Sequence, residues 1–458
     1  MKVLQSSHSL FFKIINPQKL VREKKYRLFS YCVDLEYKGK FYLYNTLTSE
    51  LLCLENAEGN FLKKEILSGF DFTNQEYLVE KYFWVPVEHD DCSFYKSYLS
   101  TMQALSVKPY KNTFTILPTT DCNARCFYCF EKNCKKLNIT PQIADDIADF
   151  IIKSSHGNMV KILWFGGEPL FNDKAIDLIS KRISASGIEY ASKMISNGYL
   201  FDEKRIEKAK ELWNLKQVQI TIDGTEKIYN KRKAYIYTDD SSPFLTVMGN
   251  IESLLKHSIN VLIRLNMDDS NFCDLMNLAD YLSERFSRFK NFSVYVSLIY
   301  DSNSSSFEFY SSDIQELYAK REKVVEKLRT KKIYFEKKLE NRFKLNQCIA
   351  DNPNALIIYP DGKLGKCEHH MDTNHIGSIY EDEINTGEVA NWRKYITIRE
   401  DCYKCKLFPQ CLQLLNCKEF PNFCLDRDRE FKLNELKLRI INKINSYYTE
   451  AEDVFSDS

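Results

Sequence analysis

Three cysteines, Cys122, Cys126 and Cys129, stand close together directly after the apolar run 113–117. The run predicts a strand, so the cysteines lie on the loop that leaves it. Three thiolates on one short loop can ligate three irons of a [4Fe–4S] cluster, which leaves the fourth iron without a protein ligand. An open iron can bind a small molecule, so the spacing indicates a catalytic cluster rather than an electron relay. The alternative is a zinc site, but zinc usually takes two separated pairs of ligands.

Apolar runs and amphipathic stretches alternate after the cysteine loop. The further expected strands are 161–165, 191–195, 217–222, 260–266 and 291–299, and the expected helices are 143–153, 173–183, 203–213, 243–256 and 272–286. Thr140 and Pro141 form an N-cap and a first helical position at the start of this series. The alternation predicts an α/β fold with a parallel sheet and outer helices, either a barrel or a doubly wound sheet.

Small or polar residues follow several of these strands. Gly166, Gly167 and Glu168 follow the second strand, and two glycines let a backbone approach a ligand closely. Ser196 and Asn197 end the third strand. Because α/β folds place ligands at the carboxyl ends of parallel strands, we expect these residues to line one site.

The CxxxCxxC loop, with Tyr128 before the third cysteine, and the Gly-Gly-Glu segment resemble the radical SAM superfamily. The resemblance implies a partial (β/α)6 barrel over residues 110–300. It also implies that S-adenosylmethionine chelates the open iron and is cleaved to a 5′-deoxyadenosyl radical. The residues implied to bind this cosubstrate are Tyr128, Gly166, Gly167, Glu168, Ser196, Asn197 and Arg264. For Arg264, a salt-bridged surface position is an equal alternative.

A second group of cysteines lies in the C-terminal third, at positions 348, 367, 402, 405, 411, 417 and 424. Between the first two of them, two apolar runs flank Pro360, Asp361 and Gly362 and predict a β-hairpin. The pattern resembles the SPASM extension of radical SAM enzymes that modify peptides. The resemblance implies one auxiliary [4Fe–4S] cluster at Cys402, Cys405, Cys411 and Cys424, and a second at Cys348, Cys367 and Cys417.

This group departs from the SPASM pattern in two ways. The gap between Cys411 and Cys417 is longer than usual, and no extra cysteine follows Cys348 closely. The fourth ligand of the second auxiliary cluster could be substrate, water, His369 or His370. Zinc is the alternative for the four cysteines of the first auxiliary cluster.

Charge and hydropathy exclude other classes. The first residues contain no signal-peptide pattern, and no apolar run approaches the length of a membrane span, so we expect a reducing, cytoplasmic location without disulfides. A net charge of +1 gives no reason to expect binding to nucleic acid or to a membrane.

The remaining segments complete the expected domain organisation. Residues 1–105 form a small α+β domain with two strands in 41–54, and they loosely resemble the winged-helix domains that bind leader peptides. A packing domain without a ligand is the alternative. Residues 301–346 are expected to form a bridge with a charged helix at 312–339, and residues 347–430 the cluster extension. The C-terminal tail is 431–458. A helix expected at 426–448 leads into this tail, and we expect it to be solvated.

Together the resemblances imply a maturase that modifies a ribosomally made peptide by hydrogen abstraction, for example through a thioether or carbon–carbon crosslink. It would use one catalytic and two auxiliary [4Fe–4S] clusters and take electrons from a flavodoxin or ferredoxin. The first alternative is an anaerobic sulfatase-maturating enzyme that forms formylglycine, with Glu368 as a carboxylate base. The alternative from another class is a non-catalytic iron–sulfur module that binds peptides.

Overall fold

The chain folds into two compact units. The computed structural model describes residues 1–6, 9–55, 59, 74–236, 242–301, 308–309, 313–339, 348–369, 373–381, 383–394, 400–411 and 426–456. Unit 1 comprises Met1–Val107, Glu336–Cys348 and Ile396–Ser458, and unit 2 comprises Lys108–Phe335 and Ile349–Tyr395. The expected cluster extension, 347–430, is therefore divided between the two units.

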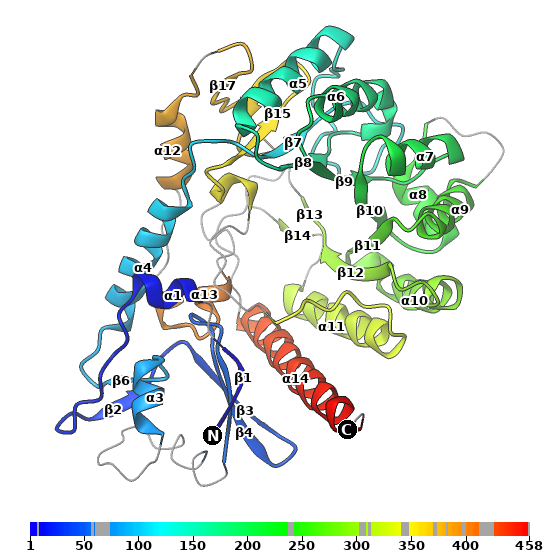
Figure 1. Ribbon diagram of the computed structural model, residues 1–458. Coiled ribbons are helices and arrows are strands. Elements are labelled where there is room, and N and C mark those ends of the chain that lie inside the picture. The colour runs from blue at the N-terminus through cyan, green and yellow to red at the C-terminus, as the bar shows by residue number, and fades with distance from the viewer. Residues whose placement is uncertain are drawn as a thin grey trace. The chain divides into compact units, whose positions relative to one another are not determined.

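Six consecutive parallel strands form the centre of unit 2 (Figure 1). They follow the order of the sequence, as β12-β11-β10-β9-β8-β7. Their bounds are β7 Thr113–Ile116, β8 Val160–Trp164, β9 Tyr190–Ser196, β10 Leu215–Ile222, β11 Asn260–Met267 and β12 Phe292–Leu298. The parallel order and the intervening helices confirm the expected partial (β/α)6 barrel.

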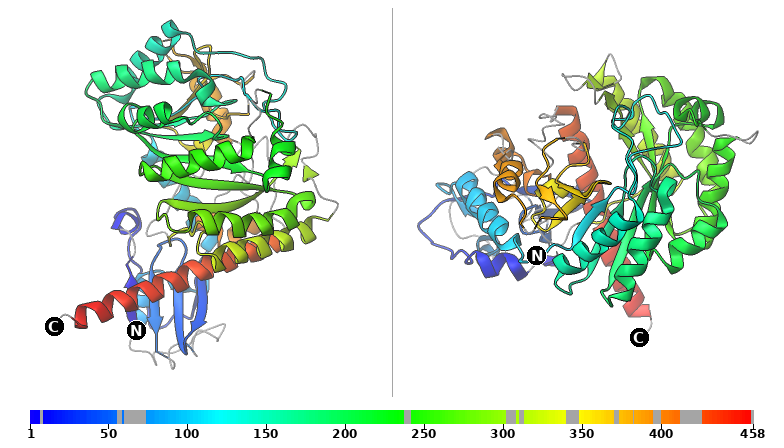
Figure 2. Two further views of the ribbon diagram at one scale, coloured as in Figure 1. Left: turned by 90° about the vertical axis from the view of Figure 1, so that its right-hand side faces the viewer. Right: turned by 90° about the horizontal axis from the view of Figure 1, so that it is seen from above.

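Helices cover the outer face of this sheet (Figure 2). They are α5 Pro141–Ser155, α6 Asp173–Ala185, α7 Glu203–Glu211, α8 Glu226–Lys233, α9 Pro243–Lys256 and α10 Phe272–Phe286, with short 3-10 turns at Pro169–Asn172 and Asp269–Asn271. The expected cap is present in α5, where Thr140 Oγ1 accepts from the Ile143 amide at 3.3 Å. Ala144, Ile147 and Ile151 share one face of α5 and are fully buried, which holds the helix on the sheet.

The charged helix expected at 312–339 is shorter than predicted. α11, Ile314–Thr330, ends where Lys332 adopts a left-handed backbone conformation with φ 59°. Tyr334 then pairs with Val294 of β12, so the following residues are extended rather than helical. α11 buries Leu317, Val324 and other apolar residues within unit 2, where it serves as the helix of the sixth βα unit.

The expected hairpin extends the barrel sheet at its β7 edge. β15 (Ala355–Ile358) and β16 (Lys363–Gly365) pair in antiparallel register, and Gly362 has the positive φ of 81° that the turn requires. β15 also pairs with β7 in parallel, and the short β17 (Gly377–Ser378) pairs with β16. The hairpin therefore belongs to the sheet that carries the cysteine loop, which its local sequence does not reveal.

Unit 1 is built on a four-stranded antiparallel sheet in the order β1-β5-β4-β3. The strands are β1 Lys2–Gln5, β3 Cys32–Tyr37, β4 Lys40–Asn45 and β5 Leu51–Leu54, and a separate pair joins β2 Tyr26–Leu28 to β6 Trp84–Pro86. The two strands expected within 41–54 are thus confirmed. The sheet has two edges, β1 and β3.

Helices complete both units. In unit 1 they are α1 Ser9–Ile14, α3 Gln75–Glu80, α4 Asp91–Ser106, α13 Phe408–Cys411 and α14 Asp426–Ser456, and in unit 2 α12 Thr386–Lys394 follows β17. The expectation of a solvated tail helix is wrong for one face of α14. Leu436, Ile440 and Ile444 recur every four residues and are buried in a cluster with Tyr42 and Leu51 of the sheet. Within the described ranges, none of the helices combines the length and the apolar content that a membrane span needs.

Candidate active site

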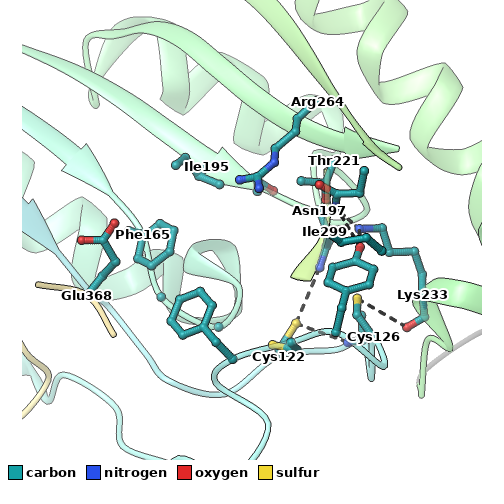
Figure 3. A pocket seen from close by; sticks show the side chains of 18 of the residues that line it. Cys122, Cys126, Phe165, Ile195, Asn197, Thr221, Lys233, Arg264, Ile299 and Glu368 are labelled. Carbon is teal, nitrogen blue, oxygen red and sulfur yellow. Dashed lines mark hydrogen bonds between the residues drawn. The ribbon is translucent and has the colours of Figure 1, made fainter. Parts of the chain in front are cut away.

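A cavity of about 270 Å³ in unit 2 collects most of the expected site residues (Figure 3). All three cysteines of the β7–α5 loop line it, together with residues from the carboxyl ends of β8 to β12. The other lining residues include Tyr128, Gly166, Gly167, Ser196, Asn197, Thr221, Lys233, Arg264, Asn266, Glu368 and His369. Ten expected positions from widely separated motifs therefore reach one cavity: the three cysteines, the glycine pair, the Ser196–Asn197 pair, Tyr128, Arg264 and Glu368.

The cysteine loop is held on both sides by backbone contacts. Thr120 pairs with the returning segment, because its amide donates to the Leu137 carbonyl at 3.0 Å and its Oγ1 atom accepts from the Leu137 amide at 2.8 Å. Farther along, the Arg125 amide donates to the Lys233 carbonyl at 2.9 Å. These bonds fix the loop that carries the three thiols before any ligand binds.

Gly166 and Gly167 are required where the two loops meet. A Cβ atom on Gly166 would lie 2.3 Å from the Thr119 carbonyl oxygen, and one on Gly167 would lie 2.2 Å from that of Asp121. Gly166 also has a φ of 110°, which side chains disfavour. The Gly167 amide donates to Thr119 at 3.1 Å. The glycines therefore serve loop packing as well as lining the cavity.

Glu168 is fully buried and takes a different position from the glycines. Its carboxylate accepts from Ser196 Oγ at 2.9 Å, from the Asn197 amide at 2.8 Å and from the Leu170 amide at 3.2 Å. Burial raises the pKa of Glu168 to about 7, although these hydrogen bonds oppose the rise. Glu168 is not among the residues that line the cavity. In this structure it joins the glycine loop to the end of β9, and its predicted contact with a cosubstrate stays a prediction.

Asn197 connects the end of β9 to the cysteine loop. Its Nδ2 atom donates to Asn123 Oδ1 at 2.7 Å and lies 3.9 Å from the Cys122 sulfur. Asn123 is buried between two of the cysteines and was not identified from the sequence. An asparagine next to a cysteine is too common to mark a site, so only the contact reveals its role.

A network of buried polar side chains adjoins the cysteine loop, with Lys233 at its centre. The Lys233 ammonium donates to the Tyr128 hydroxyl at 3.0 Å and to Thr221 Oγ1 at 2.7 Å. Tyr128 donates to Asp223 Oδ2 at 2.5 Å and accepts from Asn266 Nδ2 at 3.0 Å. Lys233 and Asp223 lie 3.6 Å apart and are both buried, so their charges compensate each other. The network joins the cysteine loop to the ends of β10 and β11.

Nothing in the sequence marks Lys233 as part of the site. It ends the run Lys231–Lys233 at the last turn of α8, where basic residues usually face solvent and favour the helix dipole. Yet its side chain is 2% exposed and lines the cavity. The tertiary structure alone turns it inward.

Arg264 extends from β11 into the cavity (Figure 3). Its Nη2 atom donates to Ser297 Oγ at 3.0 Å, and its Nε atom is buried without a hydrogen-bond partner. Among the described residues, no carboxylate forms an ion pair with Arg264. Arg264 therefore lines the cavity, and its expected contact with the methionine carboxylate stays a prediction.

Glu368 and His369 reach the same cavity from the end of the hairpin. The His369 ring stacks on Phe130 of the cysteine loop, with ring centroids 3.9 Å apart and an angle of 21°. Burial raises the pKa of Glu368, which favours its neutral form near the cavity. The residues that follow Cys367 thus meet the barrel site, while His370 lies outside the described residues.

The second group of cysteines is distributed over both units. Cys348, Cys402, Cys405 and Cys411 lie in unit 1, whereas Cys367 lies in unit 2. Cys417 and Cys424 lie outside the described residues. Within unit 1, the Cys405 amide donates to the Cys402 carbonyl at 3.0 Å, so these two begin a compact turn. The assignment of two auxiliary clusters stays a prediction.

The chemistry of the three loop cysteines fits an iron–sulfur cluster. Burial raises the pKa of the Cys122 thiol to about 12 and that of Cys129 to about 11, so without a bound cation the thiolates would be costly here. Within the part of the chain that the structure describes, no group of three or more His, Cys, Asp or Glu side chains is arranged to hold a single metal ion. A cubane offers each thiolate a separate iron, so three spaced sulfurs around a cavity suit it.

Comparisons with known proteins agree with this site. Residues 116–282 match the model of the Radical SAM superfamily. A GTP 3′,8-cyclase of Clostridium perfringens strain SM101 is 25% identical over 264 residues, which cover 55% of this chain and 78% of that protein. An uncharacterised protein of Methanocaldococcus jannaschii is 36% identical over 112 residues, 24% of this chain and 37% of its own length.

Solved structures show the same fold at low sequence identity. The protein anSMEcpe, solved with bound AdoMet and the Cp18Cys peptide, aligns with a TM-score of 0.56 and 17% identity over 73% of this chain and 99% of its own. SuiB of Streptococcus suis, solved with its precursor peptide SuiA, aligns with a TM-score of 0.51 and 14% identity over 88% of this chain and 99% of its own. The likeness extends beyond the matched residues 116–282.

Proposed function

Residues 116–282 form a radical SAM domain, and we propose that the chain uses it to modify a ribosomally made precursor peptide by hydrogen abstraction. The family uses a [4Fe–4S] cluster and S-adenosylmethionine. When reduced, the cluster supplies the electron that cleaves S-adenosylmethionine to a 5′-deoxyadenosyl radical. The observation that carries the proposal is the convergence of Cys122, Cys126 and Cys129 with the glycine pair on one cavity.

Each group around the cavity has a defined part in this proposal. The three cysteines hold the cluster. The Lys233 network joins Tyr128 of the cysteine loop to the end of β10. Arg264 supplies a positive charge for a carboxylate, such as that of the methionine moiety. Ser196 and Asn197 line the wall beside Cys122 and can bind polar groups of the nucleoside.

A peptide substrate is favoured by two features. The solved structures of anSMEcpe and SuiB that share this fold were obtained with peptides bound. The chain also carries the second cysteine group at 348–424, which resembles the extension of peptide-modifying radical SAM enzymes. Within this proposal the two auxiliary clusters accept an electron from the substrate radical or bind the substrate, and a crosslink is the expected product.

Formylglycine formation is the first alternative within the same class. It is supported by the position of Glu368, which lines the cavity and follows the hairpin cysteine directly. In this alternative, Glu368 acts in its ionised form and takes a proton from a serine or cysteine substrate. The expected substrate is then an unmodified sulfatase rather than a short precursor.

A second function is favoured by the curated relatives that are named GTP 3′,8-cyclase. The similarity covers 55% of this chain and 78% of the first of these relatives. In this second function a purine nucleotide binds in the cavity, beside Arg264. One assay distinguishes the competing functions by the substrate that is converted. The reconstituted chain is incubated anaerobically with reductant and S-adenosylmethionine, and then with GTP, a sulfatase-derived peptide, or peptides encoded near its gene.

The expected result is turnover-coupled 5′-deoxyadenosine with a peptide, detected with a mass change in that peptide. Conversion of GTP to a cyclised nucleotide would replace the peptide proposal by the cyclase function. Absence of 5′-deoxyadenosine with any substrate, at full iron content, would contradict both.

A further inference from the structure

We propose that the outer surface of the cysteine loop is the docking face for a small acidic one-electron carrier protein. The inference rests on the proposed function, because only a catalytic cluster at Cys122, Cys126 and Cys129 needs an electron at this place. In each event one electron passes from the reduced carrier to the cluster. The carrier leaves oxidised by one electron, and no atom is transferred.

The exposed side chains of this loop carry an excess of positive charge. The exposed side chains that carry a charge are Arg125, Lys132, Lys135 and Lys136. Residues 121–136 contain two carboxylates: Asp121, with its side chain 30% exposed, and Glu131, which is buried at 4%. Because the whole chain has a net charge of only +1, this local excess does not follow from its average composition.

The positive side chains gather in one place. Arg125 and Lys136 both approach the same oxygen of Asp121, at 4.0 and 3.9 Å. The carbonyl of Lys135 accepts from Thr120 Oγ1 at 2.6 Å, so the lysine segment folds back onto the start of the cysteine loop. The cations therefore form a patch beside the cluster ligands rather than a row along an extended loop.

An exposed aromatic ring lies on the same loop. Phe127, between Cys126 and Tyr128, is 41% exposed. The Arg232 guanidinium stacks at 4.8 Å from the centroid of this ring, and it pairs with Asp268 at 2.7 Å. An apolar ring next to cations is the composition of an interface centre with a charged rim. The ring belongs to the residue that directly follows Cys126.

These features favour an acidic redox protein over other partners. Opposite charges raise the rate of encounter and orient the partners, while exposed ion pairs add little to affinity. Fast association with weak binding suits a carrier that must leave after delivering one electron. A nucleic acid or an anionic membrane would also meet positive charge, but neither delivers an electron.

Charge reversal at two exposed lysines tests the proposal. The variant is Lys132→Glu with Lys135→Glu, both exposed and outside the cluster ligands. The matched control is Lys204→Glu with Lys210→Glu on α7, which changes the net charge equally at exposed positions of the same unit. In both, cluster reduction is followed by absorbance at equal iron content, with a reduced flavodoxin or with reduced methyl viologen, and the affinity for oxidised flavodoxin is titrated separately.

We expect flavodoxin-driven reduction of the Lys132/Lys135 variant to fall about 10- to 100-fold at low ionic strength. The difference should shrink in high salt, because screening removes the steering. The control should change less than about twofold, and viologen-driven reduction should be unchanged in both.

Three outcomes would overturn the docking face: equal flavodoxin rates and affinities in the two variants, an equal loss in the control, or a loss with viologen while flavodoxin affinity is unchanged. Failure of the proposed function is distinct from these. It would show as no 5′-deoxyadenosine from the iron-loaded parent with viologen, whatever the variants do.

Discussion

The two cysteine groups of this chain differ in how their members are brought together. Cys122, Cys126 and Cys129 lie on one loop after β7, which is held by hydrogen bonds to the nearby Leu137 and to the distant Lys233. The cysteines at 348–424 come from two units, with Cys367 shortly after β16 in unit 2 and Cys402 in unit 1. Cysteines on one loop are kept close together by the chain itself, whereas a dispersed set depends on long-range packing. The first group is therefore confined to one loop, whereas the second group draws on both units.

The largest expected effect is the loss of the local set. Replacing Cys122, Cys126 and Cys129 together by Ala should abolish 5′-deoxyadenosine formation. The reason is that these three cysteines line the cavity together with the glycine pair and would leave one iron of their cluster open to S-adenosylmethionine. Iron should fall from about a dozen atoms per chain by about four. The measurements are iron content and product by chromatography. Unchanged cleavage of S-adenosylmethionine in this variant would show that the catalytic cluster lies elsewhere.

The dispersed set should fail in a different way. Replacing Cys402 and Cys405 by Ala should remove about four irons and stop peptide modification, yet leave uncoupled cleavage of S-adenosylmethionine measurable. The reason is that the barrel cavity contains neither residue. Cys273→Ala, an exposed cysteine outside both groups, is the matched control. If the parent chain instead contained one zinc where the auxiliary irons are expected, the auxiliary-cluster assignment would be contradicted.

A smaller effect should follow from disturbing the contact that holds the local set. Gly167→Ala places a Cβ atom 2.2 Å from the Asp121 carbonyl oxygen, so the cysteine loop must shift. We expect a loss of about 1–3 kcal/mol in the free energy of unfolding, the range for overpacked sites, together with reduced cluster occupancy.

Gly249→Ala in α9 is the control for this substitution. Nothing lies within 4 Å of a Cβ atom there, and helix propensity favours alanine by up to about 1 kcal/mol. Equal stability changes in the two variants, measured by denaturant unfolding, would mean that the loops do not need the close approach seen here.

The smallest effect should come from Arg264, a cation of the cavity wall. Arg264→Met should raise the KM for S-adenosylmethionine about tenfold with intact clusters, since a charged hydrogen bond to a carboxylate contributes about 1.5–3 kcal/mol. Arg288→Met, whose side chain is 65% exposed, should leave KM unchanged. Equal KM values for the parent and the Arg264 variant would show that Arg264 does not bind the carboxylate of S-adenosylmethionine.

Much of unit 2 could be predicted because its signals are local. The helices 243–256 and 272–286 were placed at the observed bounds, since their apolar residues recur at helical spacing between clear end signals. The charged helix after β12 was overextended to Leu339, because its charge pattern continues past the left-handed turn at Lys332 that ends it. Backbone turns without glycine leave no such mark in the sequence.

For the site, the sequence by itself determined which cysteines and glycines meet at the cavity. The spacing of Cys122, Cys126 and Cys129 is a local chemical requirement, and Gly166 and Gly167 follow a strand end whose place in a parallel sheet is predictable. Only the tertiary structure decided the rest. Lys233 turns inward and Glu168 becomes a buried link because partners at the ends of β9 and β10 stand opposite them. Such burial depends on contacts between residues far apart in the chain, which no local pattern encodes.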